Sequence, residues 1–413
     1  MKYKYKSIFL AVLLICGINL AQTNQTAVED FKPASTNQPG KEYPQVNSEG
    51  RVRASISAPE ALKIQLDISA VKYDLTKDEK GVWTGDSNPQ DEGFHYYQLW
   101  IDGAAVPDPS SLYFYGAGRW GSGIEIPAKD QDFYALKNVP HGELREVHYF
   151  SKSTNAVRRC FVYTPPSYDE NTTNRYPVLY LQHGMGEDET GWGNQGHDNL
   201  IMDNLIAEGK AKPFIIVMDN SSINFPGGPG GGRPGMGARR PDTTDSTSAR
   251  DSNQTRRSGF RNFNFAAQFE KILINELIPF IDANYRTLTD QPHRAMAGLS
   301  MGGMQTRQIT LANLNTFSQI GIFSGGSISM EDVNNTPDFK EKVKLVFISY
   351  GSRELENRQV RGRGPFGGDP KANTEELKQA GLNSVFYVST NTAHEWQSWR
   401  RSLHEFAQLL FKN

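Results

Sequence analysis

A serine flanked by glycines constrains the fold of this chain more than any other feature. The motif Gly298-x-Ser300-x-Gly302 follows an apolar run typical of a buried strand and precedes residues 304–311, which predict a helix. A serine between a strand and a helix must occupy a strained turn, and glycines beside it let neighbouring elements approach closely. Such a turn exposes the hydroxyl above the sheet and aims the helix N-terminus at the group that is attacked. The motif therefore favours Ser300 as a nucleophile over a serine in an ordinary structural turn.

Strand and helix patterns alternate around this motif. A hairpin is predicted first, followed by apolar strand-like runs at residues 176–181, 214–218, 317–323, 345–349 and 384–388, with helical patterns at 199–206, 263–285, 374–380 and 396–411. Alternation of this kind predicts a largely parallel sheet covered by helices on both faces, with its chemistry at the carboxyl ends of the strands. The expected fold class is α/β, with an α/β-hydrolase fold catalytic domain over residues 140–413.

A smaller domain is expected before it. Residues 49–135 contain short alternating segments separated by turn signals, which predict an all-β sandwich. The aromatic run 94–101 is expected in the core of that sandwich, and the glycine- and aromatic-rich segment 110–126 reads as a long connection that reaches the neighbouring cleft or packs between the domains. Residues 22–48 are polar and without a period, so they read as a linker.

The N-terminus resembles an export signal. Lys2, Lys4 and Lys6 precede an apolar run that ends near Ala21, so residues 1–21 are expected to be a signal peptide and the protein to be secreted or periplasmic. Cleavage would leave Cys160 as the sole cysteine. The formal net charge of −2 gives no reason to expect a nucleic-acid partner or an anionic membrane, and no membrane association is expected after cleavage.

A serine nucleophile needs a base and an acid that orients the base. In the α/β-hydrolase order the acid and then the histidine follow the serine. His394 follows a strand directly, whereas His404 lies inside the last helix, so His394 is the predicted base. Glu354 is the first candidate for the acid, because it follows the strand at 345–349. The alternative acids are Glu356 and Asp369, and each of the three could instead be a solvated loop carboxylate without a catalytic role.

Acyl transfer also needs donors to the developing oxyanion. The N–H of Met301, directly after the serine, is one candidate. The second is expected from the loop after the first parallel strand, at Met185 or its neighbour Gly184. His183 in the same loop is expected to be structural. The sequence has no Cys/His cluster with metal-ligand spacing, so neither a metal nor another cofactor is expected.

Several motifs together resemble carbohydrate esterase family one, the feruloyl and acetylxylan esterases related to esterase D. The matching segments are 162–168, 182–192, 298–303, 351–354, His394-Glu-Trp396 and Trp399-Arg400. The resemblance implies a Ser300–His394–acid triad and an acyl-enzyme intermediate, although the family's usual acid is aspartate. Trp192, Gln305 and Trp396 match positions near the family's substrate cleft, and each also fits a buried packing residue.

Residues 45–135 resemble a second family, the immunoglobulin-like carbohydrate-binding family forty-eight, on segments 57–61, 78–83 and 97–109. Together the resemblances imply an exported serine esterase acting on feruloyl or acetyl esters of xylan-type plant polysaccharide. The alternatives are a siderophore esterase of the enterochelin type and a non-catalytic glycan-binding protein. The glycine-rich segments 226–237 and 361–368 lack the ending of a phosphate-binding loop and are expected to be surface insertions.

Overall fold

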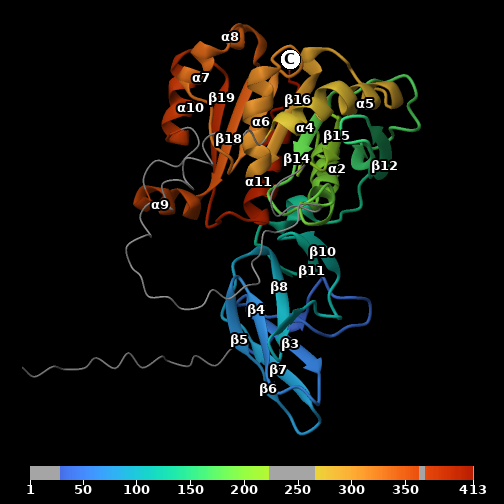
Figure 1. Ribbon diagram of the computed structural model, residues 1–413, viewed down its shortest axis with the longest axis vertical. Coiled ribbons are helices and arrows are strands. Elements are labelled where there is room, and N and C mark those ends of the chain that lie inside the picture. Colours follow the sequence, from blue (N-terminus) through green and yellow to red (C-terminus); the bar gives the residue numbers. More distant parts are fainter. Residues whose placement is uncertain (1–27, 223–265, 362–367, 413) are drawn as a thin grey trace, which may run out of the picture.

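A computed structural model describes residues 28–222, 266–361 and 368–412, which form an N-terminal all-β unit and a larger α/β unit (Figure 1). The expected signal peptide and the segment 226–237 lie outside the described residues, as does most of the segment 361–368. Within these ranges, no helix combines the length and the apolar character that a membrane span requires.

The N-terminal unit consists of two antiparallel sheets. The first has the strand order β1-β2-β3-β7-β6 and the second β10-β11-β8-β4-β5, with β9 paired to β8. Their buried side chains meet in one core that includes Val52, Leu66, Trp83 and Tyr97. The strands are β1 (Lys32–Pro33), β2 (Gln45–Val46), β3 (Val52–Ser57), β4 (Ile64–Ile68), β5 (Val71–Asp74), β6 (Thr76–Lys77), β7 (Val82–Asp86), β8 (Gly93–Ile101), β9 (Ala104–Val106), β10 (Tyr113–Gly116) and β11 (Arg119–Ile126).

Two sequence predictions change in this unit. The expected linker is wrong over residues 32–46, because β1 and β2 join the first sheet and Ala34 and Val46 are buried in its core. Strands of two residues carry no periodicity, so composition alone could not reveal them. The expected connection at 110–126 is instead the hairpin β10–β11. The immunoglobulin-like topology and the resemblance to family forty-eight stay predictions.

The α/β unit has one mixed sheet with the order β12-β13-β15-β14-β16-β17-β18-β19. Strand β13 is antiparallel to both its neighbours, β12 and β15, and all the other neighbouring pairs are parallel. This is the sheet of an α/β-hydrolase-type domain. Its strands are β12 (Glu143–Ser151), β13 (Ala156–Thr164), β14 (Val178–Gln182), β15 (Ile215–Asp219), β16 (Arg294–Leu299), β17 (Gln319–Phe323), β18 (Leu345–Gly351) and β19 (Ser384–Ser389).

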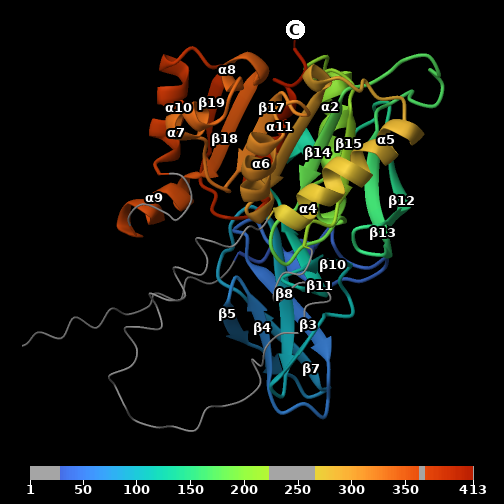
Figure 2. The same cartoon turned by 45° about the horizontal axis from the view of Figure 1, so that its top comes forward.

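Helices cover both faces of this sheet (Figures 1 and 2). On one face, α2 and α11 pack against Phe323 and Phe347, and on the other α4, α5, α6 and α10 pack against residues such as Met296 and Ile348. The helices are α1 (Gly191–Asn194), α2 (Asp198–Ala207), α4 (Ala267–Ile272), α5 (Ile278–Asn284), α6 (Met301–Ala312), α7 (Met330–Asn335), α8 (Phe339–Lys342), α9 (Ser352–Arg361), α10 (Pro370–Gln379) and α11 (Trp396–Ala407).

The single helix expected at 263–285 has a π-helical turn, Leu273–Leu277, between α4 and α5. Pro279 follows this turn. Proline lacks the N–H of a helical residue and its ring collides with the carbonyl four residues earlier. A wider turn just before a proline relieves that collision, so the interruption has a local cause in the sequence.

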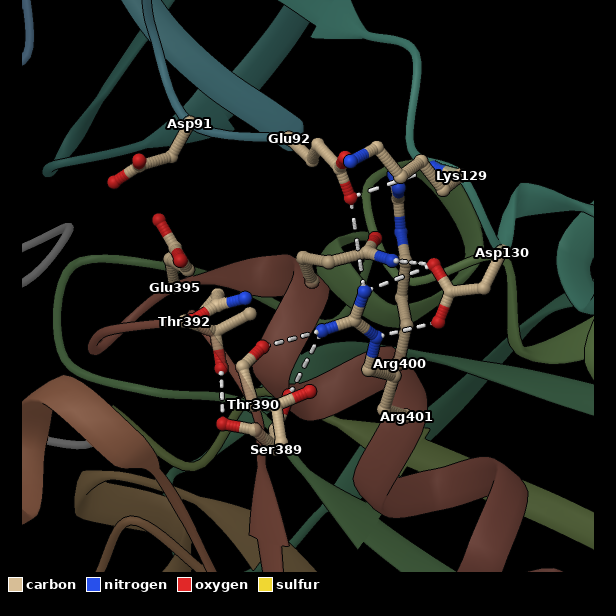
Figure 3. Close-up of polar contacts among 12 residues, drawn as sticks. Asp91, Glu92, Lys129, Asp130, Ser389, Thr390, Thr392, Glu395, Arg400 and Arg401 are labelled. Carbon is tan, nitrogen blue, oxygen red and sulfur yellow. Dashed lines mark hydrogen bonds and ion pairs between the residues drawn. The ribbon is translucent and has the colours of Figure 1, made fainter.

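Charged side chains join the two units along α11. Arg400 is fully buried, and its guanidinium donates to both carboxylate oxygens of Glu125, at 2.6 and 3.0 Å. Arg401 makes a second two-fold contact, to Asp130 at 2.7 and 2.9 Å (Figure 3). A cavity of about 1070 Å³ lies beside this cluster and is lined by both units, but by neither Ser300 nor His394. The N-terminal unit is therefore tied to the α/β unit by one buried ion pair and one more exposed ion pair.

Candidate active site

Ser300 lies in the sharp turn between β16 and α6. Its backbone has φ 51° and ψ −114°, a conformation that L residues rarely adopt. The neighbouring glycines are required by space: a Cβ on Gly298 would lie 2.5 Å from the backbone of Gly302, and one on Gly302 would lie 2.5 Å from the carbonyl of His183. The turn that the sequence predicted is present, with the helix starting at Met301.

The structure brings the three predicted catalytic side chains together. Nε2 of His394 lies 2.9 Å from the hydroxyl of Ser300, and Nδ1 lies 2.8 Å from Oε2 of Glu354. Since a carboxylate only accepts, the proton is assigned to Nδ1, and Nε2 then accepts from the serine hydroxyl. Ser300 follows β16, Glu354 follows β18 and His394 follows β19. The three side chains therefore meet at the carboxyl edge of the sheet, as expected for this fold.

Glu354 is fixed by further donors. Its other oxygen, Oε1, accepts from the hydroxyl of Ser324 at 2.6 Å and from the N–H of Gly351 at 3.0 Å. Ser324 in turn accepts from the indole N–H of Trp399 at 3.2 Å, and the indole ring lies perpendicular to the ring of His394, with the ring centroids 5.1 Å apart. The sequence analysis did not identify Ser324 or Trp399, because Ser324 follows β17 and Trp399 lies on α11, 75 residues further along the chain.

The alternative acids and histidines lie elsewhere. Glu356 is exposed, and the carboxylate of Asp369 caps α10 by accepting from two backbone N–H groups. His404, on α11, contacts its neighbour Glu405 and the ring of Phe133. His183 is buried, and its Nε2 accepts from the backbone N–H of Ser221, as a structural histidine would.

The loop after β14 lies against the serine turn. A Cβ on Gly184 would lie 3.5 Å from the Cβ of Ser300. The N–H of Gly184 donates to Oε2 of Glu187 at 3.1 Å, so the structure argues against Gly184 as an oxyanion donor. Met185 stays the predicted second donor beside Met301. The N–H of Met301 opens α6, where first-turn N–H groups have no acceptor within their own helix.

The three predicted substrate contacts are buried instead of lining a cleft. Trp192 is 1% exposed and donates to the carbonyl of Gln182, and its ring packs edge-on against Trp396, which is 2% exposed. Gln305 is 1% exposed and donates to the carbonyl of Ser221. These three side chains pack inside the protein and are not exposed to a substrate, so their assignment as substrate contacts is corrected.

A buried carboxylate that the sequence reasoning passed over completes the site. Glu187 is fully buried, and burial raises its pKa to about 7, although the Gly184 N–H and the nearby His394 oppose that rise. Its Oε1 lies 3.5 Å from the hydroxyl of Tyr96, a residue of β8 in the N-terminal unit. Glu187 lies within the segment 182–192, but no sequence pattern in that segment predicts a contact with Tyr96 of the N-terminal unit.

A model of the putative esterase family matches residues 151–225 and 236–409 of this sequence. This match covers more than half of the chain. The chain therefore belongs to the putative esterase family.

One curated relative matches almost the whole chain. An endo-1,4-beta-xylanase/feruloyl esterase of Xylanibacter ruminicola is 42% identical over 407 residues, 97% of this chain and 50% of the relative. The chain thus spans half the length of that relative. The family match and this relative support the resemblance to a family-one-type carbohydrate esterase.

A solved structure has a similar fold. The enterobactin esterase FES of Shigella flexneri, determined in the presence of enterobactin, has a TM-score of 0.57 and 15% identity, covering 87% of this chain and 92% of that chain. The ferulic acid esterase of Anaeromyces mucronatus has 22% identity and a TM-score of 0.49, covering 69% of this chain and 96% of that chain. At 15% identity, the likeness to the enterobactin esterase concerns the fold alone.

Proposed function

We propose that this protein is a feruloyl esterase that acts on esters of xylan-type plant polysaccharide and uses Ser300 as its nucleophile. The observation that supports the proposal most is the hydrogen-bonded series from Glu354 through His394 to Ser300, in an esterase-family chain with the required strained turn. The choice of feruloyl over acetyl esters rests on the name of the Xylanibacter ruminicola relative.

The mechanism follows from the geometry. Nε2 of His394 takes the proton of the Ser300 hydroxyl while the oxygen attacks the ester carbonyl, and Glu354 stabilises the imidazolium that forms. The N–H groups of Met301 and Met185 donate to the oxyanion. The bond between the acyl carbon and the sugar oxygen then breaks, the imidazolium gives its proton to that oxygen so that the sugar leaves as an alcohol, and an acyl-serine remains. A water molecule, deprotonated by the same histidine, releases the acid and restores the serine.

The remaining expectations belong to the same proposal. Residues 1–21 would direct export, and the N-terminal unit would be an immunoglobulin-like module of the family forty-eight type. A secreted protein would meet polysaccharide esters directly, because polymeric xylan does not enter cells, and a periplasmic protein would act on oligosaccharide esters. No nucleic acid and no cofactor takes part in this scheme.

Hydrolysis rates on three esters test the proposal. Methyl ferulate, acetylated xylan and a catecholate trilactone should be compared, with methyl ferulate expected to react fastest and Ser300→Ala to abolish all hydrolysis. A strong preference for the trilactone would favour a siderophore esterase instead. Hydrolysis that persists in Ser300→Ala would exclude the serine mechanism, and its absence in the unaltered protein would favour a non-catalytic glycan-binding protein.

A further inference from the structure

Strand β8 directs two adjacent tyrosines to opposite sides of the N-terminal unit. Successive side chains of a strand point to opposite faces. Tyr97 points into the core of this unit, where its hydroxyl donates to Asp108 at 2.9 Å. Tyr96 points toward the α/β unit, where its hydroxyl oxygen accepts from Gln195 at 2.7 Å and from Trp396 at 3.3 Å. The N-terminal unit therefore places one tyrosine hydroxyl inside the α/β unit.

The hydrogen of this hydroxyl is directed at Glu187. Because the Tyr96 oxygen already accepts two hydrogen bonds, its own proton must go to an acceptor. Two are in reach at 3.5 Å, Oε1 of Glu187 and the carbonyl of Tyr115, and the carboxylate is the stronger acceptor. Glu187 in turn holds the N–H of Gly184 through Oε2 and donates its own N–H to the Gly184 carbonyl at 3.3 Å. One buried carboxylate thus connects Tyr96 to the backbone beside Ser300.

A second contact from the N-terminal unit reaches the same loop. The turn of the hairpin β10–β11 donates the N–H of Gly118 to the carbonyl of Gly186 at 2.7 Å. The backbones approach so closely that a Cβ on Gly186, which has φ 79°, would lie 3.2 Å from that nitrogen. Figure 2 shows β8, β10 and β11 at the end of the N-terminal unit that meets the α/β unit. The N-terminal unit therefore contacts residues 184–187 twice, through Tyr96 at Glu187 and through Gly118 at Gly186.

We infer that Tyr96 is a positioning residue for ester hydrolysis, which acts through Glu187 to fix the loop that carries the Met185 N–H beside Ser300. The inference rests on the proposed function, because it assigns that N–H to the oxyanion. It makes hydrolysis of a small soluble ester depend on the N-terminal unit, without any glycan bound there. An oxyanion donor works only when it is held in place before the charge develops.

The test compares Tyr96→Phe with Tyr97→Phe in the full chain. Each variant removes one hydroxyl that contacts a buried carboxylate, but Tyr97 contacts nothing in the loop, which makes it the matched control. On methyl ferulate, Tyr96→Phe should lower kcat about tenfold, less than the 100- to 1000-fold loss that follows removal of an oxyanion donor. The KM should stay within about twofold, because ground-state binding does not use the oxyanion contact. Tyr97→Phe should leave both constants unchanged.

Binding of an arylboronic acid gives a second measurement. This compound forms a tetrahedral adduct on the serine and so imitates the oxyanion, whereas free ferulate imitates only the product. Tyr96→Phe should weaken the boronate by about the same factor as kcat and leave ferulate binding unchanged. An unchanged kcat in Tyr96→Phe, or equal losses in both variants, would overturn the inference while Ser300→Ala still tests the proposed function separately. A correctly folded protein without any hydrolysis or boronate binding would overturn both.

Discussion

Replacing Glu187 by glutamine should make the protein more stable at neutral and alkaline pH. Burial raises the pKa of Glu187 from the ordinary 4.5 to about 7 in the folded protein. Between these two pH values the folded protein keeps a proton that the unfolded chain has released, so wild-type stability falls as the pH rises through this window and is level above it. The difference corresponds to about 3 kcal/mol, at 1.36 kcal/mol per pKa unit. Glutamine has no proton to lose and keeps an oxygen for the Gly184 N–H. Its amide nitrogen replaces the oxygen that faces the Tyr96 hydroxyl, so kcat should fall as in Tyr96→Phe.

The assay is urea unfolding followed by tryptophan fluorescence at intervals from pH 4.5 to pH 8.5. The two proteins should have equal stability near pH 4.5, and the variant should gain up to about 3 kcal/mol above pH 7. Asp198→Asn is the control, because Asp198 is also fully buried with its pKa raised to about 7, but it lies in α2 away from the serine. It should gain stability over a similar range without loss of kcat. Parallel pH curves for the wild type and Glu187→Gln would refute the reasoning.

Three further predictions concern other parts of the molecule. Glu354→Gln should lower kcat about a thousandfold or more on methyl ferulate, because a neutral amide cannot stabilise the imidazolium, while the same change at the exposed Glu356 should have no effect; similar losses at both positions would contradict the assignment. Glu125→Gln should lower the free energy of unfolding by about 3–5 kcal/mol in urea titrations, since it leaves the buried Arg400 unpaired; an unchanged midpoint would argue against that role. Burial raises the pKa of the Cys160 thiol, so the thiol should react with a disulfide reagent only after unfolding, and fast reaction in the native protein would disprove its burial.

The placement of the serine, histidine and glutamate side by side was predictable because fold topology controls it. Residues that follow the strands of a parallel sheet gather at one edge, so the chain order of Ser300, Glu354 and His394 already limited the candidates. The strained turn at Ser300 was equally predictable, since it depends on local glycines. Their catalytic roles stay proposals that the substitutions above test.

The details that depend on side-chain direction were not predictable. Trp192 and Trp396 stand near strand ends, where an aromatic side chain can face a substrate or pack beneath it, and only the packing of α1 against α11 decides. The sequence cannot distinguish Gly184 from Met185 as the oxyanion donor. The structure can, because the N–H of Gly184 is already hydrogen-bonded to Glu187. Tyr96 lay within a run whose aromatics were expected in the core, and its partner is 91 residues away in another unit.

The buried pair between Arg400 and Glu125 has a consequence for how this protein can be dissected. A shortened protein that begins near Gly142 would retain the arginine on α11 but lose the carboxylate and the ring of Tyr134 that cover it. Poor yield from such a fragment would follow from the unpaired guanidinium, and weak turnover from the loss of Tyr96 as well. Neither result would show whether the missing residues bind a polysaccharide. Point substitutions on the exposed surface of the N-terminal unit can test polysaccharide binding, because they leave the Arg400–Glu125 and Arg401–Asp130 ion pairs intact.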